Sequence, residues 1–167
     1  MSENSSAAAY HYPYKGGDVI KNLEEQQLKL ASYLEPLTEK QAESGYAAGK
    51  WSVKELLGHL IDTERIMAYR ALAIARGEQQ PLPGFDENLY VENARFNEYP
   101  LGRLLIQYHA QRNSTIQLVA SFTPEMLSRT GIANGAPITV NEIAEKIAAH
   151  EQHHIAILEE RYLSMWH

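Results

Sequence analysis

The 167-residue sequence contains no cysteine. Disulfide bonds, thiolate nucleophiles, thiolate metal sites and iron–sulfur clusters are therefore excluded for this chain. A reaction that needs a sulfur nucleophile would have to receive it from a second molecule.

Long hydrophobic runs are also missing. No segment approaches the roughly 18 apolar residues of a membrane-spanning helix. The first residues, MSENSSAAAYHYPYKGGD, lack the basic region and apolar run of a secretory signal. We therefore expect a cytoplasmic protein.

Basic residues are fewer than acidic residues, 15 against 21. The formal net charge is −6, and the 15 lysines and arginines are scattered along the chain instead of forming a stripe. A nucleic-acid binder is expected to show a basic footprint, and an anionic membrane surface attracts clustered basic residues. We therefore expect no nucleic acid and no membrane as partner.

The sequence does contain four long segments with a helical period of apolar residues, and its length suits one domain with a sizeable core. Capping-box spacing begins two of these segments, with Ser52 before Glu55 and Thr139 before Glu142. Gly77 follows the segment that begins at Ser52 and is placed as its C-terminal cap. These features predict an all-α four-helix bundle with helices over about 18–33, 53–76, 101–122 and 139–163.

The remaining segments are expected to connect these helices. Residues 1–16 mix small and polar residues without a period and are predicted to be a flexible N-terminal arm, unless the tyrosines Tyr10, Tyr12 and Tyr14 pack back on the domain of residues 17–167. The segment 81–97 is too long for an ordinary connection and suggests a lid. Residues 123–138 are expected to be a loop with a tight turn at Asn134–Gly135.

The last predicted helix carries two histidines within its apolar face. His150 and His154 are four residues apart, which places their Cβ atoms about 5–6 Å from each other, whereas His153 points away. Neutral imidazole is the commonest side-chain ligand of zinc and related metals. His59, on the flank of another apolar stripe, is the candidate for a third ligand. The alternative is a set of hydrogen-bonded core histidines, but three together favour a shared ion.

Arg112 lies among the apolar residues of the third predicted helix. Its stem could follow the core while its head reaches water. It could instead bind a substrate carboxylate or form an ion pair with a buried acid. The acid–base residue of a reaction is not identified by the sequence, and the candidates within reach are Asp62, Glu64, Asp86, Glu151 and Tyr108.

Four stretches, WSVKELLGHLIDTERIMAYR, LPGFDEN, GIANG and HEQHHIAILEERYL, resemble the DinB-like superfamily of metal-binding four-helix bundles. The similarity extends from about Gly17 to Leu163. It implies an up-down-down-up bundle, frequent assembly as a homodimer, and a divalent ion, nickel or zinc before iron or manganese. His59, His150 and His154 match the family's metal ligands, and Arg112 matches an arginine that favours a substrate-binding role.

Members of this superfamily include transferases and isomerases that use low-molecular-weight thiols such as bacillithiol or mycothiol. The resemblance thus implies a metal-dependent transferase that joins such a thiol to a small electrophile. Two alternatives stay open at this point. One is a metal-dependent hydrolase, and the other is a non-catalytic metal-binding bundle of the stress response.

Overall fold

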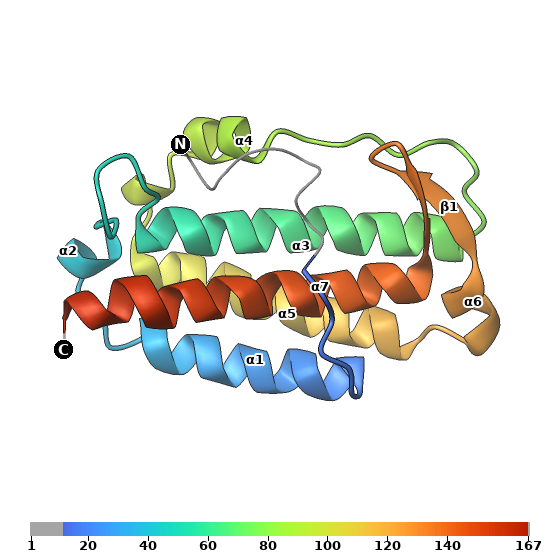
Figure 1. Cartoon of the computed structure of the whole chain (residues 1–167), viewed down its shortest axis with the longest axis horizontal. Helices are drawn as coiled ribbons and strands as arrows, with labels where there is room; N and C mark the ends of the chain where they lie inside the picture. The colour runs from blue at the N-terminus through green and yellow to red at the C-terminus, as the bar shows by residue number, and fades with distance from the viewer. Residues whose placement is uncertain (1–11, 167) are drawn as a thin grey trace.

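Four long helices form the framework of the computed structural model, which describes residues 12–166. They are α1 (Val19–Leu34), α3 (Val53–Ala75), α5 (Leu101–Ala120) and α7 (Val140–Ile157). In Figure 1, α1 and α7 run in one direction while α3 and α5 run in the other. The predicted all-α bundle with up-down-down-up order is therefore confirmed.

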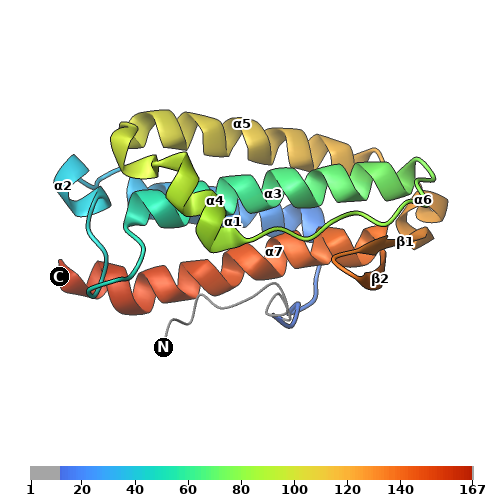
Figure 2. The ribbon, with the colours of Figure 1, turned by 90° about the horizontal axis from the view of Figure 1, so that it is seen from above.

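The helices α1 and α3 occupy diagonally opposite positions in the bundle. Each of these two contacts both α5 and α7. Seen from above, α5 and α7 lie on opposite sides of the pair formed by α1 and α3 (Figure 2). Because α3 and α7 are antiparallel and in contact, side chains from the middle of both helices meet inside the bundle.

Side-chain caps fix where the helices begin. Ser52 and Glu55 form a complete capping box at the start of α3, and Thr139 and Glu142 form another at the start of α7. Asp18 caps α1 by accepting a hydrogen bond from the backbone N–H of Lys21 at 2.8 Å. Each cap satisfies backbone donors that the first turn leaves without a partner, so the register of the histidines follows from the sequence.

The connection after α3 makes the unusual helix order feasible. Gly77 adopts a φ of +93° beyond the end of α3, and the chain then runs back along α3 to α4 (Glu87–Ala94) and a 3₁₀ turn, η1 (Phe96–Glu98) (Figure 1). Phe96 is buried, and a Cβ atom at Gly58 of α3 would lie 2.4 Å from its ring. The segment is thus docked on α3, and the lid role expected for residues 81–97 stays a prediction.

Residues 123–138 are more ordered than the expected loop. They contain α6 (Pro124–Ser128) and a hairpin of β1 (Thr130–Ala133) and β2 (Ala136–Thr139). The strands are antiparallel and pair Thr130 with Thr139. Asn134 and Gly135 have φ values of +52° and +78°, the positive signs that a two-residue type I′ hairpin turn requires. The tight turn was predicted, but the strands and α6 were not.

Short elements complete the bundle. The helix α2 (Glu39–Ala42) follows α1, and α7 continues into a π-helical turn, η2 (Leu158–Tyr162), and a 3₁₀ turn, η3 (Leu163–Met165). The last predicted helix therefore changes type after Ile157 although the chain stays helical to about the expected end. Among the described helices, none combines the length and the apolarity that crossing a membrane requires.

Part of the N-terminal arm packs on the bundle. Tyr14 donates a hydrogen bond to the backbone oxygen of Gly17 at 3.0 Å and accepts one from Asn22 at 2.7 Å. The ring of Tyr12 is stacked on that of His153. Tyr12 and Tyr14 thus pack back on the domain, which was the alternative expectation for the three tyrosines. Tyr10 and the rest of segment 1–11 lie outside the described residues.

Candidate metal centre

The three histidines singled out in the sequence meet inside the bundle. His59 projects from α3, and His150 and His154 project from α7. The Nε2 atom of His150 lies 3.0 Å from that of His59 and 3.1 Å from that of His154. One ligand atom from each ring lies within 4.8 Å of the other two. The predicted convergence of the three imidazoles is present, and the metal role itself stays a prediction.

Burial keeps these imidazoles neutral. It lowers the pKa of His59 to about 3. It also lowers the pKa of His150 and His154 well below the ordinary value, and the neighbouring histidines add to the effect in both. At neutral pH the rings therefore carry no charge and retain lone pairs for a metal ion.

The distances fit a shared ion better than a hydrogen-bonded core. The Nε2 atom of a neutral imidazole has either one proton or one lone pair. His150 can therefore satisfy only one of its two Nε2 neighbours by hydrogen bonding. Two nitrogens that each lie about 2.0–2.1 Å from one ion are about 3.0–3.4 Å apart, and the observed separations of 3.0 and 3.1 Å meet this requirement.

The Nδ1 atoms of His59 and His154, on the far side of each ring from Nε2, differ in their hydrogen-bond partners. The Nδ1 atom of His59 lies 3.4 Å from the hydroxyl of Thr63, one turn further along α3. Such a partner usually orients a ligand ring and fixes its tautomer. The Nδ1 atom of His154 is buried and has no hydrogen-bond partner among residues 12–166. The orientation of His154 is thus set by packing.

Two further aromatic rings lie close to the histidines. The ring of Trp51 is centred 4.8 Å from that of His59. The ring of Tyr12 stacks on that of His153 with a centroid distance of 3.7 Å and is centred 6.3 Å from that of His150. His153 was predicted to point away from the site, and it is not among the three rings that converge. The surroundings therefore suit a partly apolar ligand.

Arg112 of α5 lies in a buried ionic network next to this site. Its side chain is 1% exposed, so the expectation that its head reaches water is wrong. Its Nε donates to Glu64 at 2.9 Å, and its Nη1 donates to the backbone oxygen of Leu23 at 2.9 Å. Glu151 accepts hydrogen bonds from Nη2 of Arg112 and from the hydroxyl of Tyr108.

The expected alternative of an ion pair between Arg112 and a buried acid is thus confirmed. The structure pairs it with two acids, Glu64 of α3 and Glu151 of α7. A substrate-binding role for Arg112 stays a prediction, since its guanidinium already holds two carboxylates and a backbone oxygen.

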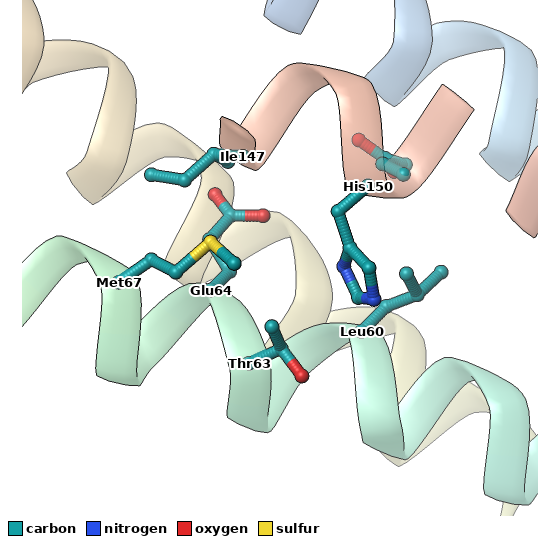
Figure 3. A pocket seen from close by; sticks show the side chains of 7 residues that line it. Leu60, Thr63, Glu64, Met67, Ile147 and His150 are labelled. Carbon is teal, nitrogen blue, oxygen red and sulfur yellow. The ribbon is translucent and has the colours of Figure 1, made fainter. Parts of the chain in front are cut away.

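A cavity of about 10 Å³ separates this network from the histidines. Four of its lining side chains come from α3 and the others come from α7 (Figure 3). The lining residues are Leu60, Thr63, Glu64, Met67, Ile147, His150 and Glu151. Its volume is about that of one water position, so the ionic network and the histidines lie next to each other with almost no space between them.

The five acid–base candidates have different surroundings. Burial raises the pKa of Glu151, although Arg112 opposes this shift, and burial with the Glu151 charge raises the pKa of Tyr108. Burial also raises the pKa of Asp62, which pairs with Arg65 at the surface. Asp86 caps α4. Two of the candidates, Glu64 and Glu151, thus line the cavity beside His150.

Glu64 and Glu151 are both buried, which the sequence did not lead us to expect. A signal was present for both. Glu64 lies between Leu60 and Met67 at spacings of four and three residues, and Glu151 lies four residues after Ile147, so each acid shares the apolar face of its helix.

The sequence matches a known protein family and a known relative. A family model described as the DinB superfamily matches residues 22–158. A proposed metal-dependent hydrolase of Oceanobacillus iheyensis is 24% identical over 140 residues, which cover 82% of this chain and 79% of that protein.

Solved structures with this fold are also known. YfiT from Bacillus subtilis, which has been proposed to be a metal-dependent hydrolase and has an unusual four-helix bundle topology, superimposes with a TM-score of 0.80 at 22% identity over 92% of both chains. A mycothiol-dependent maleylpyruvate isomerase gives a TM-score of 0.67 at 11% identity over 86% of this chain and 59% of its own. The DinB-like protein YjoA of B. subtilis gives 0.64 at 17% identity over 90% and 93%. At these identities the likeness shows a shared fold.

Proposed function

This chain belongs to the DinB superfamily, and from that premise we propose that it is a metal-dependent transferase acting with a low-molecular-weight thiol. In this proposal His59, His150 and His154 hold one divalent ion, with nickel or zinc expected, and the acceptor of the thiol is a small electrophile. The observation that carries the proposal is the convergence of three neutral imidazoles, in which the Nε2 atom of His150 lies about 3 Å from those of His59 and His154 and one ligand atom of each ring lies within 4.8 Å of the other two.

The chain's own residues determine which nucleophile suits the site. A bound divalent ion would lower the pKa of a thiol or a water molecule that reaches it. Three neutral imidazoles add no negative charge, so the site favours an anionic fourth ligand. The chain has no cysteine, and the sulfur would therefore come from a cosubstrate.

The buried carboxylates support a thiol over water as nucleophile. Glu64 and Glu151 line the cavity beside His150, but both are bound to Arg112. The oxygens of both carboxylates already accept hydrogen bonds from Arg112, and Glu151 also accepts one from Tyr108, so neither carboxylate is free to take a proton from water. A free thiol has a pKa of about 8.5 whereas that of water is about 15.7, so a thiol needs much less help to ionise.

Hydrolysis of an ester or amide is the second candidate. It is favoured by the descriptions of YfiT and of the Oceanobacillus relative as metal-dependent hydrolases. The same three histidines would hold the ion in this reaction. The two candidates therefore differ in what reaches the ion and in whether a thiol is consumed.

Cobalt substitution separates the two candidates. Bacillithiol, mycothiol and glutathione are titrated into the cobalt-loaded protein, and at least one is expected to produce a sulfur-to-cobalt charge-transfer band. His154→Ala should lose the band because one of the three ligands is missing. If no thiol gives the band, while an ester or amide is turned over and His154→Ala abolishes that turnover, the hydrolase replaces the transferase.

Removal of the ion should weaken the bundle without unfolding it. An ion bound only by the folded state at about 100 times its Kd stabilises by about 2.7 kcal/mol, or about 5–10 °C in Tm for a chain of this size. Two buried apolar clusters span the bundle independently of the histidines. We therefore expect a chelator to lower Tm by that amount while far-UV circular dichroism at 25 °C stays unchanged. Loss of the helical signal in the chelator would show that the ion, and not the core, maintains the fold.

A further inference from the structure

A second, larger cavity lies beside the candidate metal centre. It has a volume of about 510 Å³ and lies between the N-terminal arm, α3, the β1–β2 hairpin and the first half of α7. Small-molecule sites are typically clefts of about 300–1,000 Å³. We call this cavity the hairpin groove and define it by Tyr12, Met67, Arg70, Ile138, Lys146 and Ala149.

The hairpin groove adjoins the histidines. Met67 lines both the groove and the small cavity beside His150 (Figure 3). Ala149, which directly precedes His150, is also part of the groove wall. Tyr12 forms its edge and stacks on His153. A ligand lying in the groove therefore has one end next to the candidate metal centre.

Most of the wall is apolar or aromatic. Met67, Ile143 and Ala149 are buried core residues whose outer atoms face the groove. Tyr12 and Tyr14 of the arm add two aromatic side chains to the lining. Such a surface favours the carbon skeleton of a ligand because contact removes apolar area from water.

Four charged side chains line the groove, and three of them have protein partners. Glu142 accepts the hydrogen bond from the backbone N–H of Thr139 that caps α7, at 2.8 Å. Glu145 accepts a hydrogen bond from Asn141 at 3.1 Å. Arg70 donates to the backbone oxygen of Pro83 at 2.7 Å.

Lys146 is different. It is half-buried in the groove wall, and in the part of the chain that the structure describes no carboxylate lies within ion-pair distance of it. A lysine at the edge of an apolar cavity that forms no ion pair with a carboxylate of the protein can form a charge-assisted hydrogen bond with an anionic ligand.

We infer that the hairpin groove binds an organic anion with an apolar body, held by Lys146 at its charged end and lying with its other end at the histidines. This inference rests on the proposed function, because it assigns the substrate class of the same site. It adds a binding residue, Lys146, that neither the histidines nor the Arg112 network includes.

Binding of a simple probe tests the inference without relying on turnover. The probes are 4-phenylbutyrate and its neutral analogue 4-phenylbutanol, titrated into the full chain and followed by the methyl resonances of Met67 and Ile143. We expect the carboxylate to bind at least about tenfold more tightly than the alcohol, which corresponds to one charge-assisted hydrogen bond. Lys146→Gln should remove this preference. Lys40→Gln should retain it, since Lys40 is an exposed residue of α2 outside the groove.

Each titration is carried out with zinc-loaded protein and again in a chelator. This separates the test of the hairpin groove from the test of the metal centre. A preference for the carboxylate that Lys146→Gln removes supports the groove even if zinc does not bind. Zinc binding without any shift of the Met67 and Ile143 methyl groups by either probe overturns the groove and leaves the metal proposal intact. Equal affinity of wild type and Lys146→Gln for the carboxylate also overturns it.

Discussion

Replacing His154 by alanine is expected to abolish stoichiometric binding of a divalent ion. The same result is expected for His150→Ala and His59→Ala, because only two imidazoles then remain at the site. Loss of an outer hydrogen-bond partner of a metal ligand already costs about 10–100-fold in affinity, so loss of a ligand should exceed about 100-fold. Isothermal titration with zinc and nickel measures the change, and circular dichroism verifies that each variant is folded.

His153→Ala is the matched control for these variants. His153 is adjacent to His154 in the sequence, but its ring stacks on Tyr12 and is not one of the three that converge. Its replacement should leave the metal affinity within a fewfold of wild type. If the three ligand variants retained wild-type affinity, or if His153→Ala alone lost it, the assigned ligand set would be wrong.

Arg112→Met should cause the largest loss of stability of any single substitution proposed for this protein. It leaves the carboxylates of Glu64 and Glu151, 6% and 2% exposed, facing each other without their cation. Removing one partner of a buried ionic cluster costs about 3–5 kcal/mol, which corresponds to about 6–20 °C in Tm for a chain of this size. Thermal unfolding at neutral pH measures the loss.

The pH dependence of this loss identifies its electrostatic origin. Burial raises the folded-state pKa of Glu151 above the ordinary 4.5, and Arg112 opposes that rise. Removing the Arg112 guanidinium should therefore raise the pKa of Glu151 further. A carboxyl group with a raised folded-state pKa destabilises the fold above that pKa. The penalty shrinks as the pH falls through the folded-state pKa toward 4.5, because protonation then removes the buried charge. The deficit of Arg112→Met relative to wild type should therefore be larger at pH 7.5 than at pH 5.5.

Arg65→Met is the control for charge removal. Arg65 pairs with Asp62 at 3.4 Å, but its side chain is 46% exposed. Such pairs contribute less than about 1 kcal/mol, so Tm should change by a few degrees at most. Equal losses for Arg112→Met and Arg65→Met, or a deficit that does not vary with pH, would contradict the buried ionic network.

Much of the framework was predictable because local signals and tertiary structure agree. The capping boxes at Ser52 and Thr139 fix the first residue of α3 and α7. From those starts the helical period places His59, His150 and His154 toward the inside of the bundle. Their meeting also depends on α3 and α7 being neighbours, which the family resemblance supplied and periodicity alone could not.

The features missed by the sequence analysis depend on contacts between distant segments. The strands β1 and β2 have four residues each, too few to show a reliable alternation, although the Asn134–Gly135 turn between them was a readable hairpin signal. The docking of segment 81–97 depends on Phe96 filling the space above Gly58. No local pattern identifies Gly58 as the partner of that ring.

Whether the three histidines hold a metal ion is measured by the metal content of protein purified without an affinity tag. We expect close to one nickel or zinc ion per chain for the wild type, either as purified or after loading and gel filtration, and none for His154→Ala treated in the same way. Wild-type protein that retains no ion after loading, with His154→Ala indistinguishable from it, would contradict the metal centre and leave the three histidines as core side chains.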